Sequence, residues 1–272
     1  MSAAEARVSC TVTDGVADVR LDRPDKLNAL DQPMFEALVE TGLRLAEEPA
    51  VRAVVLSGNG RAFCAGLDFG AFRAMADGTR SAERIPATDR PIGPARARGQ
   101  QAAHVWTALP VPVIAAMHGV AYGGGLQIAL GADIRLVAPD ARLSVMEVRW
   151  GLVPDMTGSQ LLPELVGRDV AKELTYTARV VSGEEAAALG LATRTEPDPR
   201  AAALALATEI AERSPEAVRA AKRLLEAAGR VDLATGYEAE QREITALIGT
   251  PNQVEAVESG MAGRPPRFTD PA

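Results

Sequence analysis

The sequence predicts an α/β core followed by a helical C-terminal region. Three observations support this class: alternating β-branched runs near the N-terminus, two apolar runs that each lead into a glycine-bearing turn, and a helical pattern over most of the chain from Gly158 onward. Strands that alternate with helices are typical of a sheet covered by helices. A chain of 272 residues is long enough to bury a sizeable core. No internal repeat is present.

The N-terminal part predicts a β-hairpin and then a helix. Residues 8–13 and 16–21 alternate between apolar and polar side chains and are joined by Asp14-Gly15, which favours a type I′ turn. Asp31 is a candidate N-cap for a helix that closes near Pro49.

Two apolar runs, residues 51–57 and 111–117, are predicted as buried strands. Between them, residues 77–99 carry prolines, glycines and arginines and predict a mobile surface loop, with a helix over 100–109 after it. The arginines of this loop are Arg80, Arg84, Arg90, Arg96 and Arg98. Two interpretations of them stay open: they form a solvated face, or some of them approach phosphate groups of a ligand.

The second half of the core begins with a helix over 126–130 and continues with short strands over 134–137 and 141–145. Further along, Ser182 with Glu185 predicts a capping box, because a serine N-cap and a glutamate three residues later can satisfy two free amides. Ser214 before Pro215 predicts another helix start.

Composition excludes several classes of protein. A net charge of −7 without a long basic stripe argues against nucleic acid as a partner, and no apolar stretch reaches membrane length. Cys10 and Cys64 do not form a disulfide framework, and with only His104 and His118 besides we expect no metal site. Without a cationic and apolar leader, the expected location is the cytoplasm.

The two glycine-bearing turns carry the functional prediction. The segments 63–68 and 119–125 each follow a predicted strand, and glycine lets the backbone bend so that N–H groups point at a ligand. Two such turns can aim two amides at one oxygen, as the stabilisation of an oxyanion requires. Close helix–strand packing is the alternative explanation of the triplet 123–125. A dinucleotide-binding fingerprint is absent, which disfavours a nicotinamide-dependent oxidoreductase.

The order of several motifs resembles that of the crotonase superfamily, which includes enoyl-CoA hydratases and enoyl-CoA isomerases. The resemblance extends over nearly the whole chain. The matching residues are Arg23-Pro24-x-x-x-Asn28-Ala29-Leu30, Phe63-Cys64-Ala65-Gly66-x-Asp68, Gly123-Gly124-Gly125, Glu147 with Gly151, and Arg267-Phe268.

The resemblance implies a spiral ββα core with a CoA-thioester site over residues 1–200 and a helical trimerisation region over 201–272. It implies an acyl-CoA thioester as substrate, with coenzyme A as part of the substrate and no other cofactor. It also implies a homotrimer or a dimer of trimers.

Site residues follow from the same resemblance. The backbone N–H groups of Leu67 and Gly124 would form the oxyanion hole. The residues that would line the coenzyme A arm are Lys26, Leu27, Asn28, Ala65 and Asp68.

The carboxylates distinguish the possible reactions. Hydratases of the superfamily typically have two glutamates, but the first position here is Gln127, and an amide cannot act as a general base. Glu147 matches the second position, and Asp155 follows at a spacing used by dienoyl-CoA isomerases. We therefore prefer double-bond isomerisation by Glu147, with Glu147 or Asp155 returning the proton.

Several alternatives remain. Hydration could use Glu147 alone with Gln127 orienting water, or the chain could be a non-catalytic acyl-CoA binder. Structural interpretations are a salt bridge between Glu147 and Arg149, an N-cap role for Asp155, and a hydrogen-bonding role for Gln127. For Cys64 a small buried hydrophobe is preferred over a nucleophile.

Overall fold

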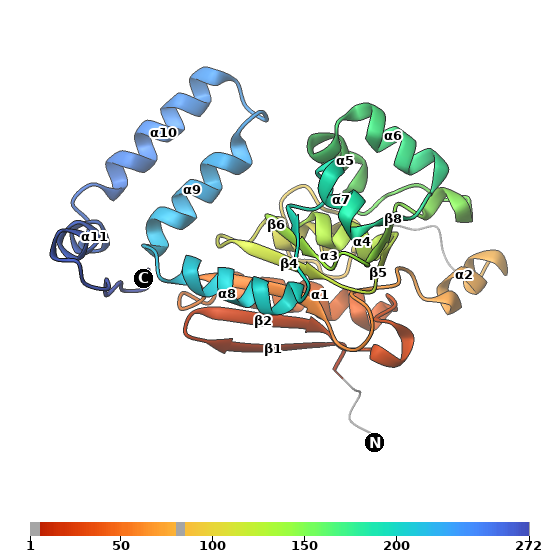
Figure 1. The fold of residues 1–272 in the computed structure, drawn as a ribbon. Helices are drawn as coiled ribbons and strands as arrows, with labels where there is room; N and C mark the ends of the chain where they lie inside the picture. Colours follow the sequence, from red (N-terminus) through yellow and green to blue (C-terminus); the bar gives the residue numbers. More distant parts are fainter. Residues whose placement is uncertain (1–5, 80–84, 272) are drawn as a thin grey trace.

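The computed structural model describes residues 6–79 and 85–271, and it confirms the predicted α/β class (Figure 1). Nine strands of the described residues form two sheets, in which only the pairs β1–β2 and β7–β8 are antiparallel. The six-stranded sheet contains, in spatial order, β1 (Val8–Thr13), β2 (Val16–Leu21), β3 (Ala53–Gly58), β4 (Val113–Met117), β6 (Ile134–Val137) and β9 (Arg194–Thr195). The three-stranded sheet contains β5 (Val120–Tyr122), β7 (Arg142–Ser144) and β8 (Val181–Ser182).

Helices connect and cover these strands, and the ends of the predicted strands and of the helix over 100–109 are shifted by no more than two residues. The α-helices are α1 (Gln32–Ala46), α2 (Phe69–Ala76), α3 (Arg98–Thr107), α4 (Gly124–Leu130), α5 (Gly158–Val166), α6 (Arg168–Thr177), α7 (Gly183–Leu189), α8 (Pro199–Ala211), α9 (Pro215–Ala227), α10 (Leu233–Leu247) and α11 (Pro251–Ala262). The short 3₁₀ helices of the described residues are η1 (Pro24–Lys26) and η2 (Glu147–Trp150).

The N-terminal hairpin and the first helix start are confirmed. Asp14 and Gly15 have φ values of +48° and +79°, the left-handed pair that a type I′ turn requires. Asp31 caps α1, and its Oδ1 accepts a hydrogen bond from the Met34 amide at 2.9 Å. The two serine N-caps predicted further along the chain differ in their hydrogen bonds. The Ser182 side chain accepts from the Glu185 amide at the start of α7, whereas the Ser214 side chain forms no cap bond at the start of α9.

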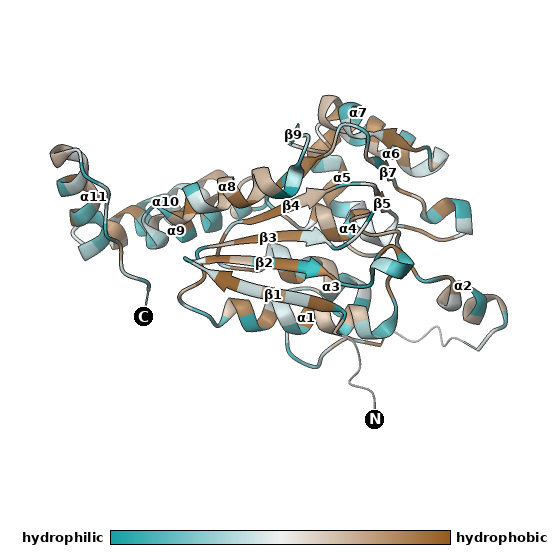
Figure 2. Cartoon of the chain, turned by 60° about the horizontal axis from the view of Figure 1, so that its bottom comes forward, coloured by the Kyte–Doolittle hydropathy of each residue, from teal (hydrophilic) through white to brown (hydrophobic). Residues whose placement is uncertain are grey.

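The central strands β3 and β4 of the six-stranded sheet are buried on both faces. Val54 and Leu56 of β3 belong to the core that contains α1 and α3, while Ala53 and Val55 belong to the core beneath α8. Alternate residues of a strand point to opposite faces, so a strand covered on both sides is apolar throughout. Figure 2 shows this hydrophobic colouring along β3 and β4. Small side chains on the covering helix allow close contact with the sheet: Ala203, Ala207 and Ala211.

The segment before α3 differs from the predicted mobile surface loop. Ile92 and Ala95 are buried, and the Gln101 Oε1 accepts hydrogen bonds from the amides of Ala87 and Thr88 at 2.7 and 3.1 Å. These contacts hold residues 85–97 against the core. Helix α2, which precedes the segment, was not predicted from the sequence. Arg80 and Arg84 lie outside the described residues.

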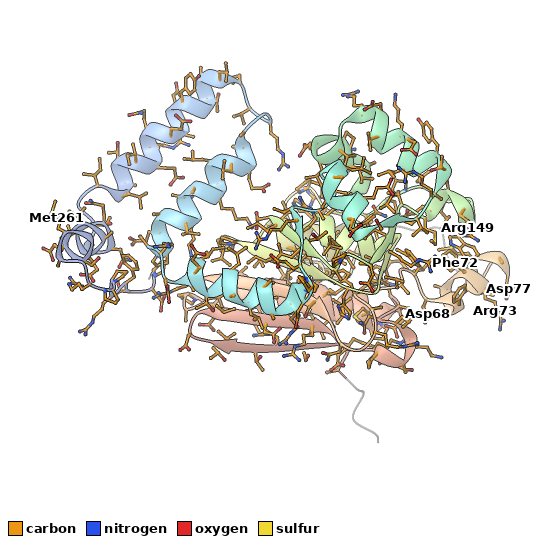
Figure 3. The ribbon with its side chains drawn as sticks, in the orientation of Figure 1. Asp68, Phe72, Arg73, Asp77, Arg149 and Met261 are labelled. Atoms are coloured by element: carbon orange, nitrogen blue, oxygen red, sulfur yellow. The ribbon has the colours of Figure 1, made fainter. Side chains whose placement is uncertain are left out.

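The C-terminal helices begin on the sheet and then leave it (Figure 1). The boundary proposed at residue 200 falls at the start of α8, which packs on β2, β3, β4 and β6. Lys222 anchors α9, because its buried Nζ donates to the Val111 carbonyl at 2.9 Å and to Asp133 Oδ2 at 2.8 Å. Met261 on α11 is exposed and lies at the opposite end of the molecule from Phe72 and Arg149 (Figure 3). None of the described helices is long and apolar enough to cross a membrane.

Asn28 joins the segment after β2 to the segment after β3. Its buried Nδ2 donates toward the carbonyl oxygens of Asn59, Ala62 and Phe63 at 3.0, 2.8 and 3.1 Å, and its Oδ1 accepts from the Arg23 amide at 2.8 Å. Its φ of +56° lies in the left-handed region, which asparagine tolerates better than most residues. The first glycine-bearing turn therefore starts from a fixed position.

We expect Asn28→Ala to lower the free energy of unfolding by about 2–4 kcal/mol, because four backbone groups lose a buried partner. Thermal and urea unfolding measure this loss, and Asp25→Asn on the exposed η1 is the control, with an expected change within about 0.5 kcal/mol.

In Asn28→Asp, a carboxylate would face the same three carbonyl oxygens, so its pKa would be raised in the folded state. The loss of stability should then be smallest near about pH 4 and grow as pH rises toward neutrality. A loss that does not change with pH would contradict this account of the Asn28 contacts.

Candidate active site

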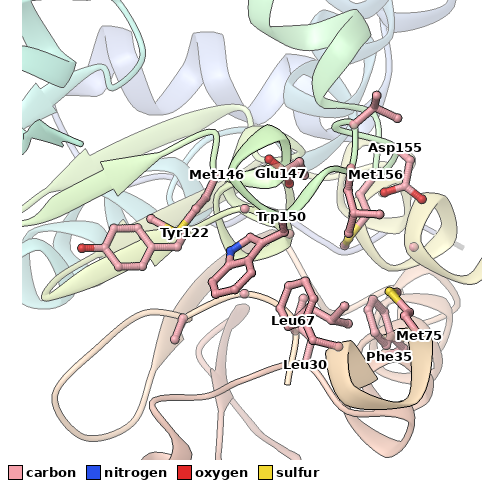
Figure 4. Close-up of a pocket in the computed structure, with 18 of the residues that line it drawn as sticks. Leu30, Phe35, Leu67, Met75, Tyr122, Met146, Glu147, Trp150, Asp155 and Met156 are labelled. Atoms are coloured by element: carbon pink, nitrogen blue, oxygen red, sulfur yellow. The ribbon is translucent and has the colours of Figure 1, made fainter. Parts of the chain in front are cut away.

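A cavity of about 250 Å³ opens beside the two glycine-bearing turns (Figure 4). Most of its wall is apolar, and helix α2 and the 3₁₀ helix η2 contribute large side chains to it. The apolar lining residues include Leu30, Phe35, Leu67, Phe72, Met75 and Trp150. The lining residues whose side chains carry polar groups are Arg98, Tyr122, Glu147, Trp150 and Asp155.

The two turns run side by side because their strands pair. The Cys64 amide donates to the Val120 carbonyl at 3.0 Å, and the Tyr122 amide donates to the Cys64 carbonyl at 3.1 Å. This parallel bridge joins Cys64 to Ala121. Leu67 and Gly124 each lie three residues beyond the bridge, and both line the cavity.

The amide of Leu67 points away from Leu30, the residue with which Leu67 forms a parallel bridge. Leu30 donates to the Gly66 carbonyl at 2.8 Å, and Asp68 donates to the Leu30 carbonyl at 3.1 Å. In a trans peptide the C=O of Gly66 and the N–H of Leu67 point in opposite directions, so the Leu67 amide faces the other side. Gly124 is the first residue of α4, where backbone amides have no partner inside the helix. Among the described residues, neither amide has a hydrogen-bond acceptor.

The glycines of the second turn are required by close contacts. A Cβ at Gly124 would lie 2.8 Å from Met156 Sδ, and a Cβ at Gly125 would lie 2.5 Å from the Cys64 carbonyl oxygen. Gly123 has a φ of +50°, which favours glycine. The triplet 123–125 therefore allows close packing and also leaves an amide free to face the cavity, so the two explanations of its glycines do not exclude each other.

Glu147 is a buried carboxylate beside this turn. Its Oε1 accepts a hydrogen bond of 2.5 Å from Gln127 Nε2, and its Oε2 has no partner among the described residues. Burial raises the pKa of Glu147, and the negative charge of Asp155 adds to the increase. Glu147 is buried, and it forms no ion pair with Arg149 in the described part of the chain, so the structure does not contain the salt bridge considered for these two residues.

Gln127 lies behind Glu147 and does not line the cavity. Its Oε1 accepts from the amides of Met156 and Gly158, both at 2.9 Å, which leaves Nε2 to face Glu147. The side chain is 2% exposed. Gln127 thus fixes one oxygen of Glu147 in place.

Asp155 is an exposed carboxylate that lines the cavity on the same side as Met156 (Figure 4). The N-cap of the following helix α5 is Thr157, not Asp155. Asp155 therefore remains available to the cavity.

Of the five residues that we expected to line the coenzyme A arm, only Ala65 lines the cavity. Ala65 lines the cavity, and its amide donates to the Leu27 carbonyl at 2.9 Å. Lys26 and Leu27 lie outside the cavity wall, and Lys26 is exposed. Asn28 is occupied by the backbone contacts described above.

Asp68 has a local structural role in this fold. Its Oδ1 accepts from the Gly70 amide at 2.7 Å and caps α2, and its Oδ2 pairs with Arg23 Nη1 at 2.6 Å. Both contacts hold helix α2 beside the cavity.

Cys64 has the environment of a buried apolar residue. Burial raises the pKa of its thiol to about 12, and its Sγ donates to the Asn28 carbonyl at 3.0 Å. The thiol therefore stays protonated near neutral pH.

The sequence analysis did not predict an aromatic cluster that includes the lining residues Phe72 and Trp150. The rings of Phe72 and Trp150 have centroids 4.9 Å apart, and the ring of Phe69 packs against Trp150 edge to face at 6.0 Å. The apolar run of residues 69–76 was the available signal for α2. Contact with Trp150 is a tertiary feature that no local pattern contains.

Comparisons with known proteins agree with the motif order. Residues 11–271 match the sequence profile of the family described as Enoyl-CoA hydratase/isomerase. The chain is 34% identical to enoyl-CoA hydratase domain-containing protein 2 of Mus musculus, over 93% of this chain and 84% of that protein. It is 32% identical to the mitochondrial methylglutaconyl-CoA hydratase of the same species, over 93% and 79%.

Solved structures show the same fold. The crystal structure of an enoyl-CoA hydratase from Bacillus anthracis superposes with a TM-score of 0.86 at 32% identity, covering 96% of this chain and 98% of that one. The resemblance to the crotonase superfamily is thereby confirmed. The chain belongs to the enoyl-CoA hydratase/isomerase family of that superfamily.

Proposed function

We propose that the protein isomerises the double bond of an enoyl-CoA thioester. The observation that carries the proposal is the position of the buried carboxylate Glu147, which lines the same cavity as the amides of Leu67 and Gly124, for which the described residues supply no acceptor. Coenzyme A enters as part of the substrate. Proton transfer and amide hydrogen bonds are the only chemistry required, so the proposal includes no further cofactor.

The proposed reaction moves one proton between two carbons. Glu147 removes a proton from C2 of a 3-enoyl-CoA, and the electron pair delocalises through the thioester to give an enolate. The amides of Leu67 and Gly124 donate to the enolate oxygen, where the negative charge develops. Return of a proton to C4, by Glu147 or Asp155, forms the 2-enoyl-CoA and restores the enzyme.

Hydration is the second candidate, because relatives named as hydratases match the chain over most of its length. It would use Glu147 with Gln127 orienting the water. The contacts of Gln127 favour isomerisation instead: its oxygen accepts from two amides, its nitrogen donates to Glu147, and it does not line the cavity. A non-catalytic acyl-CoA binder would retain the two amides but show no turnover.

We further infer that other copies of the chain contact the C-terminal helices, as a homotrimer or a dimer of trimers. Large apolar side chains on α9, α10 and α11 are exposed, and such surfaces are typical of interaction sites. They include Leu225, Leu233, Ile244 and Met261. A cytoplasmic location stays a prediction.

Glu147→Gln should lower kcat for conversion of a 3-enoyl-CoA about 10²- to 10⁴-fold, because the amide cannot transfer the proton. Binding of a saturated acyl-CoA should change little. Product analysis with separate 3-enoyl-CoA and 2-enoyl-CoA substrates measures both reactions, and Glu48→Gln on the exposed surface is the matched control. Rapid hydration without migration of the double bond would refute the isomerase proposal, and tight binding without turnover would indicate the binder.

Gln127→Glu should raise the ratio of hydration to isomerisation. The variant places a second titratable carboxyl next to Glu147, which is the pair that addition of water can use, and like charges this close share a proton. The measurement is the partition of a 2-enoyl-CoA between hydrated and isomerised products. An unchanged ratio would show that Gln127 does not determine the reaction.

The pH dependence should report the raised pKa of Glu147. Because the base must be deprotonated, kcat/KM should fall as pH decreases through a midpoint above about 4.3, the ordinary value for glutamate. Asp155→Asn removes a neighbouring negative charge, so the midpoint should move to lower pH. If Asp155 also returns the proton, kcat at the plateau falls as well; a midpoint that moves upward would contradict the electrostatic argument.

A further inference from the structure

Arg98 is a cation in the wall of a mostly apolar cavity. It is the first residue of α3, and its amide donates to the Ile85 carbonyl at 3.0 Å. Its side chain also borders a second cavity, of about 410 Å³, which shares the wall formed by Leu30, Phe35 and Leu67 with the first. Arg98 thus lies where the space for a bound acyl chain could continue beneath α2.

The charge of Arg98 has no counter-ion among the described residues. Glu147 and Asp155 line the same cavity, yet neither forms an ion pair with it within 4.0 Å. The Nε of Arg98 is shielded from solvent and has no hydrogen-bond acceptor among the residues that the structure describes. A shielded donor without an acceptor is unfavourable, so a ligand that supplies an acceptor gains from filling this position.

Arg98 lies toward the acyl end of the cavity. The next residue, Gly99, packs on Met156, since a Cβ there would be 2.7 Å from Met156 Cγ. Met156 lies across the cavity from Tyr122 (Figure 4). The turn that contains Ala65 packs against Tyr122, and this is the side of the proposed coenzyme A arm.

We propose that Arg98 binds a carboxylate at the far end of the acyl chain, so that the preferred substrates are monothioesters of dicarboxylic acids. The inference rests on the proposed function, since it requires an acyl-CoA in this cavity. A guanidinium binds a carboxylate through two parallel hydrogen bonds, which adds geometric selectivity to the charge attraction. An acyl chain that ends in a methyl group would pack against the apolar wall of the cavity but would leave the Arg98 Nε without an acceptor.

The test compares two matched series of saturated acyl-CoA thioesters, one ending in a methyl group and one in a carboxylate, by calorimetry. At the best chain length, Arg98→Met should raise the Kd of the carboxylate-ended ligand about 10- to 100-fold, as expected for a hydrogen bond to a charged group. The Kd of the methyl-ended ligand should change less than about 3-fold. Turnover of the corresponding 3-enoyl-CoA pair should show the same selectivity in kcat/KM.

Two further variants keep the test interpretable. Arg98→Lys retains the charge without the planar fork and should lose part of the selectivity. Arg96→Met is the matched control, because Arg96 is exposed and its guanidinium donates to the Gly93 carbonyl.

Each other outcome has a distinct meaning. If Arg98→Met weakens free coenzyme A and both series equally, the guanidinium contacts a phosphate and the proposal is overturned. No loss of affinity for the carboxylate-ended series overturns it as well. If the unmodified protein binds neither series, the proposed function fails; normal turnover of methyl-ended substrates without carboxylate selectivity leaves that function intact and removes only the role of Arg98.

Discussion

The backbone pairing of Cys64 with Ala121 is the constraint on which the candidate site depends. It holds two segments that are far apart in the sequence in parallel, so that the turns after β3 and β4 reach the same cavity. Asn28 supports this pairing, because its side chain donates hydrogen bonds to the carbonyl oxygens of Ala62 and Phe63, which directly precede Cys64. Because the pairing uses backbone atoms, the side chain of Leu67 is free to serve as part of the apolar wall.

The second requirement is a carboxylate that is buried but still reactive. A glutamate with two strong partners would be held in its charged form and would be a weak base. Among the side chains that the structure describes, only Gln127 donates to Glu147, and the orientation of Gln127 is determined by the amides of Met156 and Gly158. The segment that follows η2 therefore controls the position of the carboxylate through a neutral residue. In the proposed reaction this arrangement leaves Oε2 for the substrate.

Features that depend on contacts between residues near in the sequence could be predicted, whereas features that depend on contacts between distant residues could not. The turn at Asp14-Gly15 and the cap at Asp31 are local, so their residue types are sufficient to predict them. The glycine turns and Glu147 were identified through motif order. The contacts of Gln127 were not predicted, since its partners lie 20 to 31 residues away and two of them are backbone amides. The packing of α2 on Trp150 was not predicted either, because this contact joins residues that lie far apart in the sequence.

The state of the Cys64 sulfur has a consequence for an enzyme that handles unsaturated thioesters. A 2-enoyl thioester is an electrophile at its β-carbon, and a thiolate next to the cavity would add to it and form a stable thioether. With its acidity suppressed by burial and its hydrogen donated to the Asn28 carbonyl, the sulfur is a poor nucleophile. The protein can thus place a small, polarisable side chain against the glycine triplet 123–125 without being alkylated by an unsaturated thioester in the cavity.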